Sequence, residues 1–289
     1  MRSTSFFLCL SVLLVLSAAE SFAGDKEKTE VPIEIAGRVI LVKVKINDEG
    51  PLTFIVDTGA TETVLTPRAA QKVGVLRSRI PTALNRKMVK SISVGNTEVR
   101  NLMVFLMDPP QALSLRLDKG IDYHGILGYT FLSRYLFTID YKNKKLVLQP
   151  LSGVRRQKAY RKPDKNGNHT VAFQVKDRLV YSEGEVNGRG PVKWLVDTGA
   201  AETLLTPVAA KALKIKPGKL PGHDNVGLAT LDNVSLGSAT VKKVPTIVHV
   251  IPQDKGKVIH YHGIIGYPFL SRFAVTFNYR DLVITLKPN

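Results

Sequence analysis

Two aspartates follow apolar segments of nearly the same sequence, FIVDTGA at Phe54–Ala60 and WLVDTGA at Trp194–Ala200. A strand that runs into a turn holds such a carboxyl group at a fixed point. Two carboxyl groups about 3 Å apart cannot both ionise, so Asp57 and Asp197 would share one proton if they met. The ionised member can take a proton from an attacking water, and the protonated member can donate to a carbonyl oxygen. The pattern predicts acid–base hydrolysis without metal or cofactor, and leaves open which aspartate is the acid.

A second repeated motif makes an accidental duplication of Asp-Thr-Gly a weaker explanation. Tyr123–Tyr135 reads YHGILGYTFLSRY, and Tyr261–Phe273 reads YHGIIGYPFLSRF. In each copy two aliphatic residues precede a glycine, Gly128 or Gly266, about 70 residues after the aspartate.

Together the motifs resemble those of the retropepsin-like aspartic proteases, over essentially the whole of each copy. The resemblance implies a mainly β protein with two homologous acid-protease β-barrel lobes related by a pseudo-twofold axis, and a peptide or protein substrate. It also implies that Thr58 and Thr198 interlock across the lobe junction, while Gly59 and Gly199 let substrate backbone approach closely.

Further substrate contacts are implied by the resemblance alone. In the family, the positions after Asp-Thr-Gly hold substrate backbone, which assigns substrate binding here to Ala60, Glu62, Ala200 and Glu202. A glycine-bearing hairpin, the flap, is expected about 25 residues after each aspartate. The second copy offers Gly222 within Pro221–Asn225, whereas Pro81–Asn85 of the first copy contains no glycine. Whether the first copy has a working flap stays open.

The elements that position these residues are mostly strands. Apolar runs of strand length predict strands in the first copy at 39–46, 52–56, 101–106 and 136–139. Closing strands are expected at 146–148 and 282–286, each after a turn.

Helix signals are few and short. Thr66-Pro67 and Thr206-Pro207 each combine an N-cap residue with proline at the first helical position, and the first of these helices should end near Gly74. Another short helix is expected over Phe131–Tyr135.

The repeat divides the 289-residue chain, whose length suits two small domains. The two copies of the aspartate motif are 140 residues apart. We expect a signal peptide at 1–23, a first half at 24–150, a basic linker at 151–169 and a second half at 170–289.

The N-terminus has the pattern of a signal peptide, with Arg2, an apolar core from Phe6 to Ala19 and a cleavage site at Ser21–Ala23. Export to a periplasm or to the exterior is therefore expected, and an uncleaved leader that tethers the protein to a membrane is the alternative. The one cysteine, Cys9, lies inside this leader, which excludes a cysteine protease and a disulfide scaffold.

The formal net charge of +17 predicts a strongly basic surface. Such a surface favours acidic partners without selecting one, so we expect at most weak polyanion contact and no specific nucleic acid. His124, His260 and His262 lack the further ligands of a metal site, and hydrogen bonding is their expected role. Serine-hydrolase, zincin and nucleotide-binding motifs are missing from the sequence.

Two functions remain after these exclusions. The first is an aspartic endopeptidase, expected to be a monomer, in which Asp57 and Asp197 activate water. The alternative is a non-catalytic protein that binds a peptide or a polyanion on the same scaffold.

Overall fold

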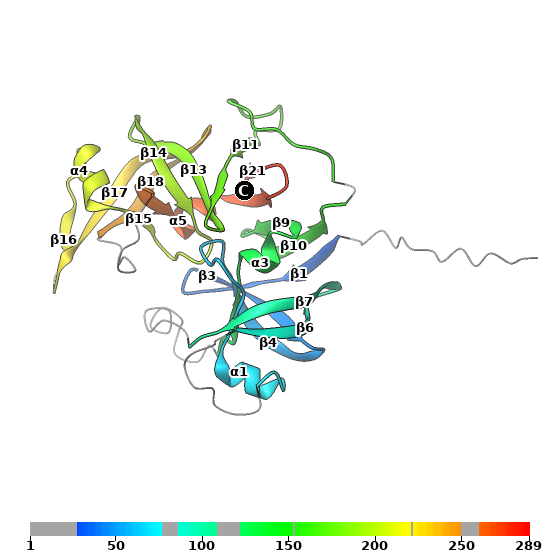
Figure 1. The fold of residues 1–289 in the computed structure, drawn as a ribbon. Coiled ribbons are helices and arrows are strands. Elements are labelled where there is room, and N and C mark those ends of the chain that lie inside the picture. Colours follow the sequence, from blue (N-terminus) through cyan, green and yellow to red (C-terminus); the bar gives the residue numbers. More distant parts are fainter. Residues whose placement is uncertain (1–27, 77–85, 109–121, 153, 221, 250–259) are drawn as a thin grey trace, which may run out of the picture.

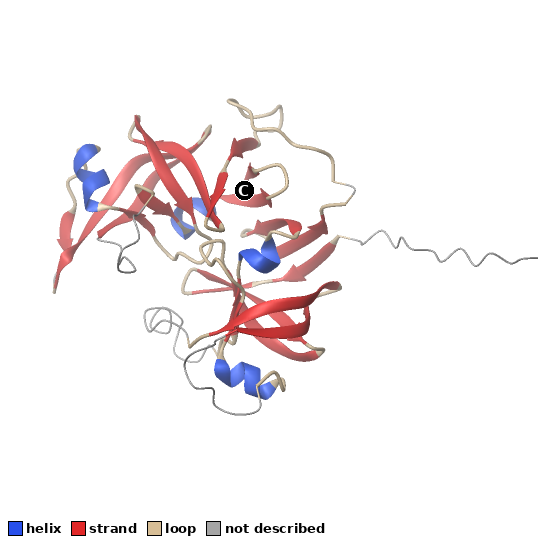
Figure 2. Cartoon of the chain, viewed as in Figure 1, coloured by secondary structure: helices blue, strands red, loops and turns tan. Residues whose placement is uncertain are grey.

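The structure is a computed structural model, which describes residues 28–76, 86–108, 122–152, 154–220, 222–249 and 260–289 (Figure 1). The expected signal peptide and the first-half flap at Pro81–Asn85 lie outside the described residues. Strands dominate the described part and the helices are short (Figure 2), so the prediction of a mainly β fold is confirmed. None of these helices has the length and apolarity that crossing a membrane requires.

The first half forms a seven-stranded sheet in the order β2-β3-β4-β8-β5-β7-β6, which the pairing of β3 with β6 closes into a barrel. Asp57 directly follows β4, whose last five residues are all buried. The strands are β2 (Glu34–Ala36), β3 (Val39–Ile46), β4 (Glu49–Val56), β5 (Val64–Leu65), β6 (Arg86–Val94), β7 (Thr97–Leu106) and β8 (Gly125–Leu127).

The second half repeats this arrangement in an eight-stranded sheet, β12-β13-β14-β19-β15-β18-β17-β16, with β13 also paired to β17. β14 carries Asp197 at its end. The strands are β12 (Gln174–Lys176), β13 (Leu179–Val186), β14 (Arg189–Val196), β15 (Thr203–Leu205), β16 (Gly218–Leu220), β17 (His223–Leu236), β18 (Ala239–His249) and β19 (Gly263–Ile265).

A third sheet of six strands joins the two halves, in the order β1-β10-β9-β20-β21-β11. At its centre β9 and β20 are antiparallel, with Thr138 opposite Thr276 and their hydroxyl oxygens 2.7 Å apart. Phe137 and Phe277 stack beside them at 4.9 Å. The strands are β1 (Thr29–Pro32), β9 (Tyr135–Asp140), β10 (Lys145–Pro150), β11 (His169–Ala172), β20 (Phe273–Asn278) and β21 (Val283–Pro288).

The linker is held against this shared sheet. The guanidinium of Arg280 donates to the carbonyl oxygens of Leu151 and Val154. The carboxylate of Asp281 accepts from the Arg156 side chain and from the Gln157 backbone. The start of the linker is therefore fixed to the second half.

The described residues also form two pairs of short helices. α1 (Pro67–Lys72) and α4 (Pro207–Ala212) begin as predicted, because the hydroxyls of Thr66 and Thr206 accept from the third backbone amide beyond them. α3 (Tyr129–Leu132) and α5 (Tyr267–Leu270) follow the two Gly-terminated motifs.

The predicted bounds of one helix were wrong. The helix expected over Phe131–Tyr135 begins at Tyr129 and ends at Leu132. Tyr135 instead starts β9, where it lies opposite Pro150 and its hydroxyl donates to the Glu98 carbonyl oxygen. Pairing in the shared sheet therefore overrides the local helix signal.

Candidate active site

Parallel strand pairing fixes the backbone of each aspartate. β4 pairs with β8 in the first half, and β14 pairs with β19 in the second. The pairing ends with the Asp57 amide donating to Leu127 O at 3.1 Å and the Asp197 amide donating to Ile265 O at 3.0 Å. The aliphatic residue before each motif glycine therefore holds the strand end that carries the acid.

The Asp-Thr-Gly turn then orients each carboxyl group. Oδ1 of Asp57 accepts from the Gly59 amide at 2.7 Å, and Oδ1 of Asp197 accepts from the Gly199 amide at 2.8 Å. Each side chain is thus bound to its own loop at one oxygen.

The two carboxyl groups meet where the loops interleave. A Cβ atom on Gly59 would lie 2.5 Å from Cγ of Asp197, and a Cβ atom on Gly199 would lie 2.5 Å from Cγ of Asp57. Any larger residue at either glycine would overlap the carboxyl group of the other half. The need for glycine here is therefore set by the opposite aspartate, whatever its role toward a substrate.

The pKa of Asp57 is raised well above its usual range. Burial of the carboxyl group is the largest cause, although the residue as a whole keeps partial exposure. The charge of Asp197 and a side-chain hydrogen bond with it act in the same direction, while the amides of Gly59 and Ala60 lower the pKa. The pair is therefore set up to retain a proton that an isolated aspartate would lose.

Two buried threonines hold the loops together by reciprocal hydrogen bonds. The Thr58 hydroxyl donates to Val196 O at 2.8 Å and accepts from the Thr198 amide at 3.0 Å. The Thr198 hydroxyl donates to Val56 O at 2.9 Å and accepts from the Thr58 amide at 3.0 Å. Every one of these bonds crosses between the halves.

The exits of the two loops are tied to the short helices. The carbonyl oxygens of Ala60 and Ala200 accept from the amides of Tyr129 and Tyr267, each at 2.9 Å. The motif glycine before each helix is required for close packing, because a Cβ atom on Gly128 would lie 2.1 Å from a backbone oxygen in the aspartate loop.

Both glutamates assigned to substrate binding have arginine partners in the opposite half. Glu202 accepts from Nη1 of Arg38 at 2.6 Å, and Glu62 accepts from Nη1 of Arg178. Each arginine lies in the two-residue turn of a hairpin, β2–β3 or β12–β13. Our sequence reasoning missed these arginines, although their separation of 140 residues, the spacing of the aspartates, was a usable signal.

Gly222 lies in the turn between β16 and β17, where Leu220 pairs with His223. Its φ of 77° is in the left-handed region that favours glycine. A Cβ atom here would meet none of the described atoms within 4 Å, so a side chain would have room at this position. The second half therefore contains a glycine-bearing hairpin, and substrate binding by Gly222 stays a prediction.

The paired histidines serve the backbone. Nδ1 of His124 accepts from the Thr53 amide at 3.1 Å, and Nδ1 of His262 accepts from the Lys193 amide at 3.0 Å. The described residues contain no group of three or more potential metal ligands from His, Cys, Asp and Glu.

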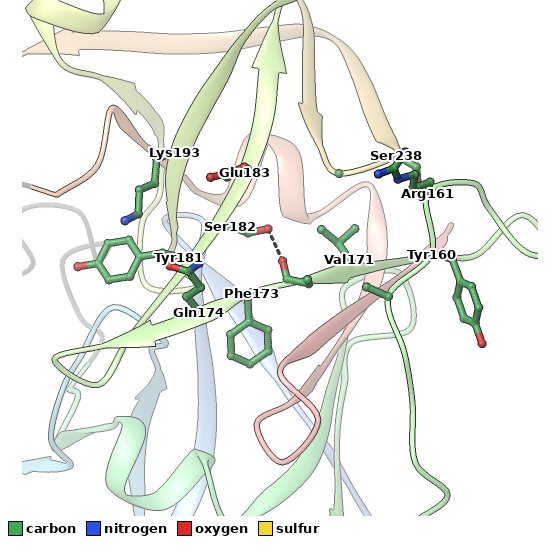
Figure 3. A pocket seen from close by; sticks show the side chains of 13 residues that line it. Tyr160, Arg161, Val171, Phe173, Gln174, Tyr181, Ser182, Glu183, Lys193 and Ser238 are labelled. Atoms are coloured by element: carbon green, nitrogen blue, oxygen red, sulfur yellow. Dashed lines mark hydrogen bonds between the residues drawn. The ribbon is translucent and has the colours of Figure 1, made fainter.

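A cavity of about 580 Å³ lies elsewhere in the second half (Figure 3). Residues of the linker, β11, β13 and the β17–β18 turn line it, and Ser182 Oγ donates to Ala172 O within it. No residue of either Asp-Thr-Gly-Ala loop contributes to its wall. The aspartate pair is therefore a separate site.

Comparison with known proteins gives the class of both halves. Residues 42–131 match a family model described as aspartyl protease, and residues 182–272 match one described as gag-polyprotein putative aspartyl protease. Each half thus matches a family model of the aspartyl protease type, on a mainly β fold.

One matching solved structure is a retropepsin-like aspartic protease from Rickettsia conorii. It is 24% identical, with a TM-score of 0.32, and the match covers 42% of this chain and 90% of that chain. No curated protein matched the chain significantly.

Proposed function

We propose that this protein is an aspartic endopeptidase in which Asp57 and Asp197 of one chain activate water. The interleaving of the loops carries the proposal, because each loop glycine leaves room only for the carboxyl group of the other half. The raised pKa of Asp57 supports it, since a pair that holds one proton supplies an acid and a base together.

The proposed reaction needs the protein's two carboxyl groups, water and the peptide. The ionised carboxylate takes a proton from water, and the oxygen of that water attacks the carbonyl carbon of the scissile bond. The protonated carboxyl group donates to the carbonyl oxygen as the tetrahedral intermediate forms. When the intermediate collapses, the C–N bond breaks, the leaving amine takes the proton that the first carboxylate had removed from water, and a hydroxyl of the intermediate returns a proton to the second carboxylate.

We propose that the substrate binds as an extended strand with apolar side chains on both sides of the scissile bond. An apolar cluster in the first half supports this, because Ala60 of the aspartate loop packs against it. Its members are Ala36, Val39, Leu41, Ile55, Val64 and Ile126, with Ala60, Phe105 and Tyr123 packed against them.

The working form is proposed to be an exported monomer, since one chain contains both acids and the N-terminal sequence has the signal-peptide pattern. The basic surface would assist encounter with acidic substrates by a salt-dependent amount.

The test is hydrolysis of an uncharged peptide library by the purified protein. Asp57→Asn and Asp197→Asn should each lower kcat by at least about 10³-fold, since removing one member of a catalytic unit disables the unit. Asp232→Asn is the matched control, because Asp232 is an exposed carboxylate paired with Lys243 on the second half. Peptide binding without cleavage, unchanged in the Asp57 and Asp197 variants, would favour the non-catalytic alternative.

A further inference from the structure

Each half places one buried tyrosine at the end of a central strand of the shared sheet. Tyr141 follows β9 and is 6% exposed, and Tyr279 follows β20 and is 8% exposed. The two occupy the same place in the repeat. Neither hydroxyl oxygen has a hydrogen-bond partner among the described residues. A buried hydroxyl without a partner is uncommon, and here it occurs twice at symmetric positions.

Each buried tyrosine packs on a residue that is bound to the aspartate loop of the other half. The ring of Tyr141 packs edge to face on Tyr267 at 5.7 Å, and Tyr279 packs in the same way on Tyr129 at 5.4 Å. Those partners donate their backbone amides to Ala200 O and Ala60 O. Each buried tyrosine is therefore linked to the aspartate loop of the other half through one residue, Tyr141 through Tyr267 and Tyr279 through Tyr129.

The electrostatics follow the same crossed pattern. Burial raises the pKa of the Tyr141 phenol, and Tyr267 and Asp197 raise it further. Burial likewise raises the pKa of Tyr279, with contributions from Tyr129 and Asp57. Both phenols therefore stay protonated at any working pH. Each one has an O–H to donate, and an aspartate of the opposite half lies within electrostatic range.

The residues directly after the two loop glycines cannot supply such a donor. Ala60 and Ala200 follow the two glycines and have no hydroxyl. A hydroxyl that donates to a carboxylate stabilises its charged form. A bridging water can carry this effect when it has polar partners on both sides.

We propose that Tyr141 and Tyr279 are positioning residues whose hydroxyls donate, each through one bridging water, to the carboxyl groups of Asp197 and Asp57 respectively. The inference rests on the proposed function in so far as the aspartate pair is catalytic. The two hydroxyls then stabilise the singly ionised form of the aspartate pair.

Other ionisable groups near the pair remain unchanged in the test. Tyr129 and Tyr267 pack on the two buried tyrosines, Asp197 raises the pKa of Tyr261, and Glu62 and Glu202 are held by arginines. On the turns that carry the two tyrosines, Asp140 is bound to Asn143, and Arg280 is bound to Asp281.

The test compares Tyr141→Phe, Tyr279→Phe and the double variant with the parent protein. Each substitution keeps the ring contacts and removes only the hydroxyl. The pH profile of kcat/KM on an uncharged peptide should move to higher pH by about half a unit in each single variant and by more in the double variant.

Tyr135→Phe is the matched control, since Tyr135 is equally buried but its hydroxyl donates to Glu98 O. It should lower the unfolding midpoint and leave the pH profile in place. A double variant that folds normally and has an unshifted profile would overturn the proposal.

A second readout separates this proposal from the proposed function. Carbon NMR of the side-chain carboxyl groups reports the titration of Asp57 and Asp197 without catalysis. Their midpoints should rise in the Tyr→Phe variants even if the parent protein hydrolyses no peptide, and unchanged midpoints would overturn the role of the tyrosines. If the parent protein showed no peptide hydrolysis that Asp57→Asn abolishes, the proposed function alone would be overturned.

Discussion

Arg38 of the first half donates to Glu202 of the second half, and Arg178 of the second half pairs with Glu62 of the first. The glutamates are 30% and 21% exposed and both arginines are 49% exposed, so the pairs are partly shielded from water. Each glutamate lies five residues after an aspartate. The two ion pairs therefore clamp the aspartate loops from opposite sides.

These cross-half pairs should contribute modestly to stability. Arg38→Gln and Glu202→Gln should each lower the free energy of unfolding by roughly 0.5–1 kcal/mol, and a double-mutant cycle should give a favourable coupling that shrinks at high salt. Urea unfolding at two salt concentrations measures it. The more exposed Lys243–Asp232 pair, which lies within one half, is the control and should couple less. Zero coupling between Arg38 and Glu202 would show that this pair does not stabilise the aspartate loops.

The threonine interlock should matter more, because its groups are buried. Thr58→Val deprives Val196 O of its donor and the Thr198 amide of its acceptor, and each buried unpaired group costs roughly 1–3 kcal/mol. Urea unfolding should show the loss, while Thr58→Ser should retain most of the stability.

Thr203→Val provides the matched comparison for the interlock. Thr203 is fully buried, and its hydroxyl has no partner among the described residues. This change should be neutral or stabilising, since it removes an unsatisfied polar atom. If Thr58→Val lowered the free energy of unfolding no more than Thr203→Val does, the interlock would not contribute to stability.

The raised pKa of Asp57 predicts the pH dependence of stability. The folded protein keeps a proton on Asp57 that the unfolded chain releases above about pH 4. The contribution of Asp57 to the free energy of unfolding is therefore fully present below about pH 4 and is lost as the pH rises through the folded-state pKa. Asp57→Asn should therefore raise the unfolding midpoint at pH 7 and change it little at pH 3.

Asp281 provides a control of opposite sign. Hydrogen bonds from Arg280 and Arg156 lower its pKa, so its contribution is present above the unfolded pKa and is lost as pH falls through the folded pKa. Asp281→Asn should destabilise the protein at pH 7. Thermal unfolding of both variants at pH 3 and pH 7 tests this. If Asp57→Asn and Asp281→Asn both lowered the unfolding midpoint at pH 7, the raised pKa of Asp57 would be contradicted.

The alanines after the two loop glycines predict where activity lies on the pH scale. Without a hydroxyl at these two positions the pair should titrate higher, which gives a bell-shaped kcat/KM profile at roughly pH 4.5–6.5. Ala60→Ser combined with Ala200→Ser should move the profile to lower pH, and Ala212→Ser on the exposed side of α4 should leave it unchanged. A profile that stays in place or moves to higher pH in the double variant would defeat the argument.

Much of the fold could be predicted because its signals are local and occur twice. The apolar run of β3 gave both bounds correctly, and the proline-led starts of α1 and α4 were correct. β6 was missed because Arg86, Lys87 and Lys90 interrupt its apolar residues, whose burial depends on pairing with β3 and β7.

The site was predictable where a residue and its role lie in one motif. The strand-acid-turn pattern singled out Asp57 and Asp197, and the structure places the carboxyl group of each against the loop glycine of the other half, while their catalytic role stays a prediction. Arg38 and Tyr141 were missed because the residues they contact lie more than 100 positions away, in the other half. No local pattern encodes such a partner.

Because the shared six-stranded sheet is built from two halves of one chain, the aspartate pair responds differently to dilution and to mutation than a pair formed by two subunits would. Two halves linked in one chain meet at an effective concentration that does not depend on how much protein is present, commonly in the millimolar range for short linkers. Paired aspartates therefore persist at dilutions where separate subunits would come apart. Each half can also change independently, and Thr130 of α3 already has Pro268 as its counterpart in α5. The chain can thus evolve unlike sides around one central pair, a freedom that an assembly of identical subunits does not have.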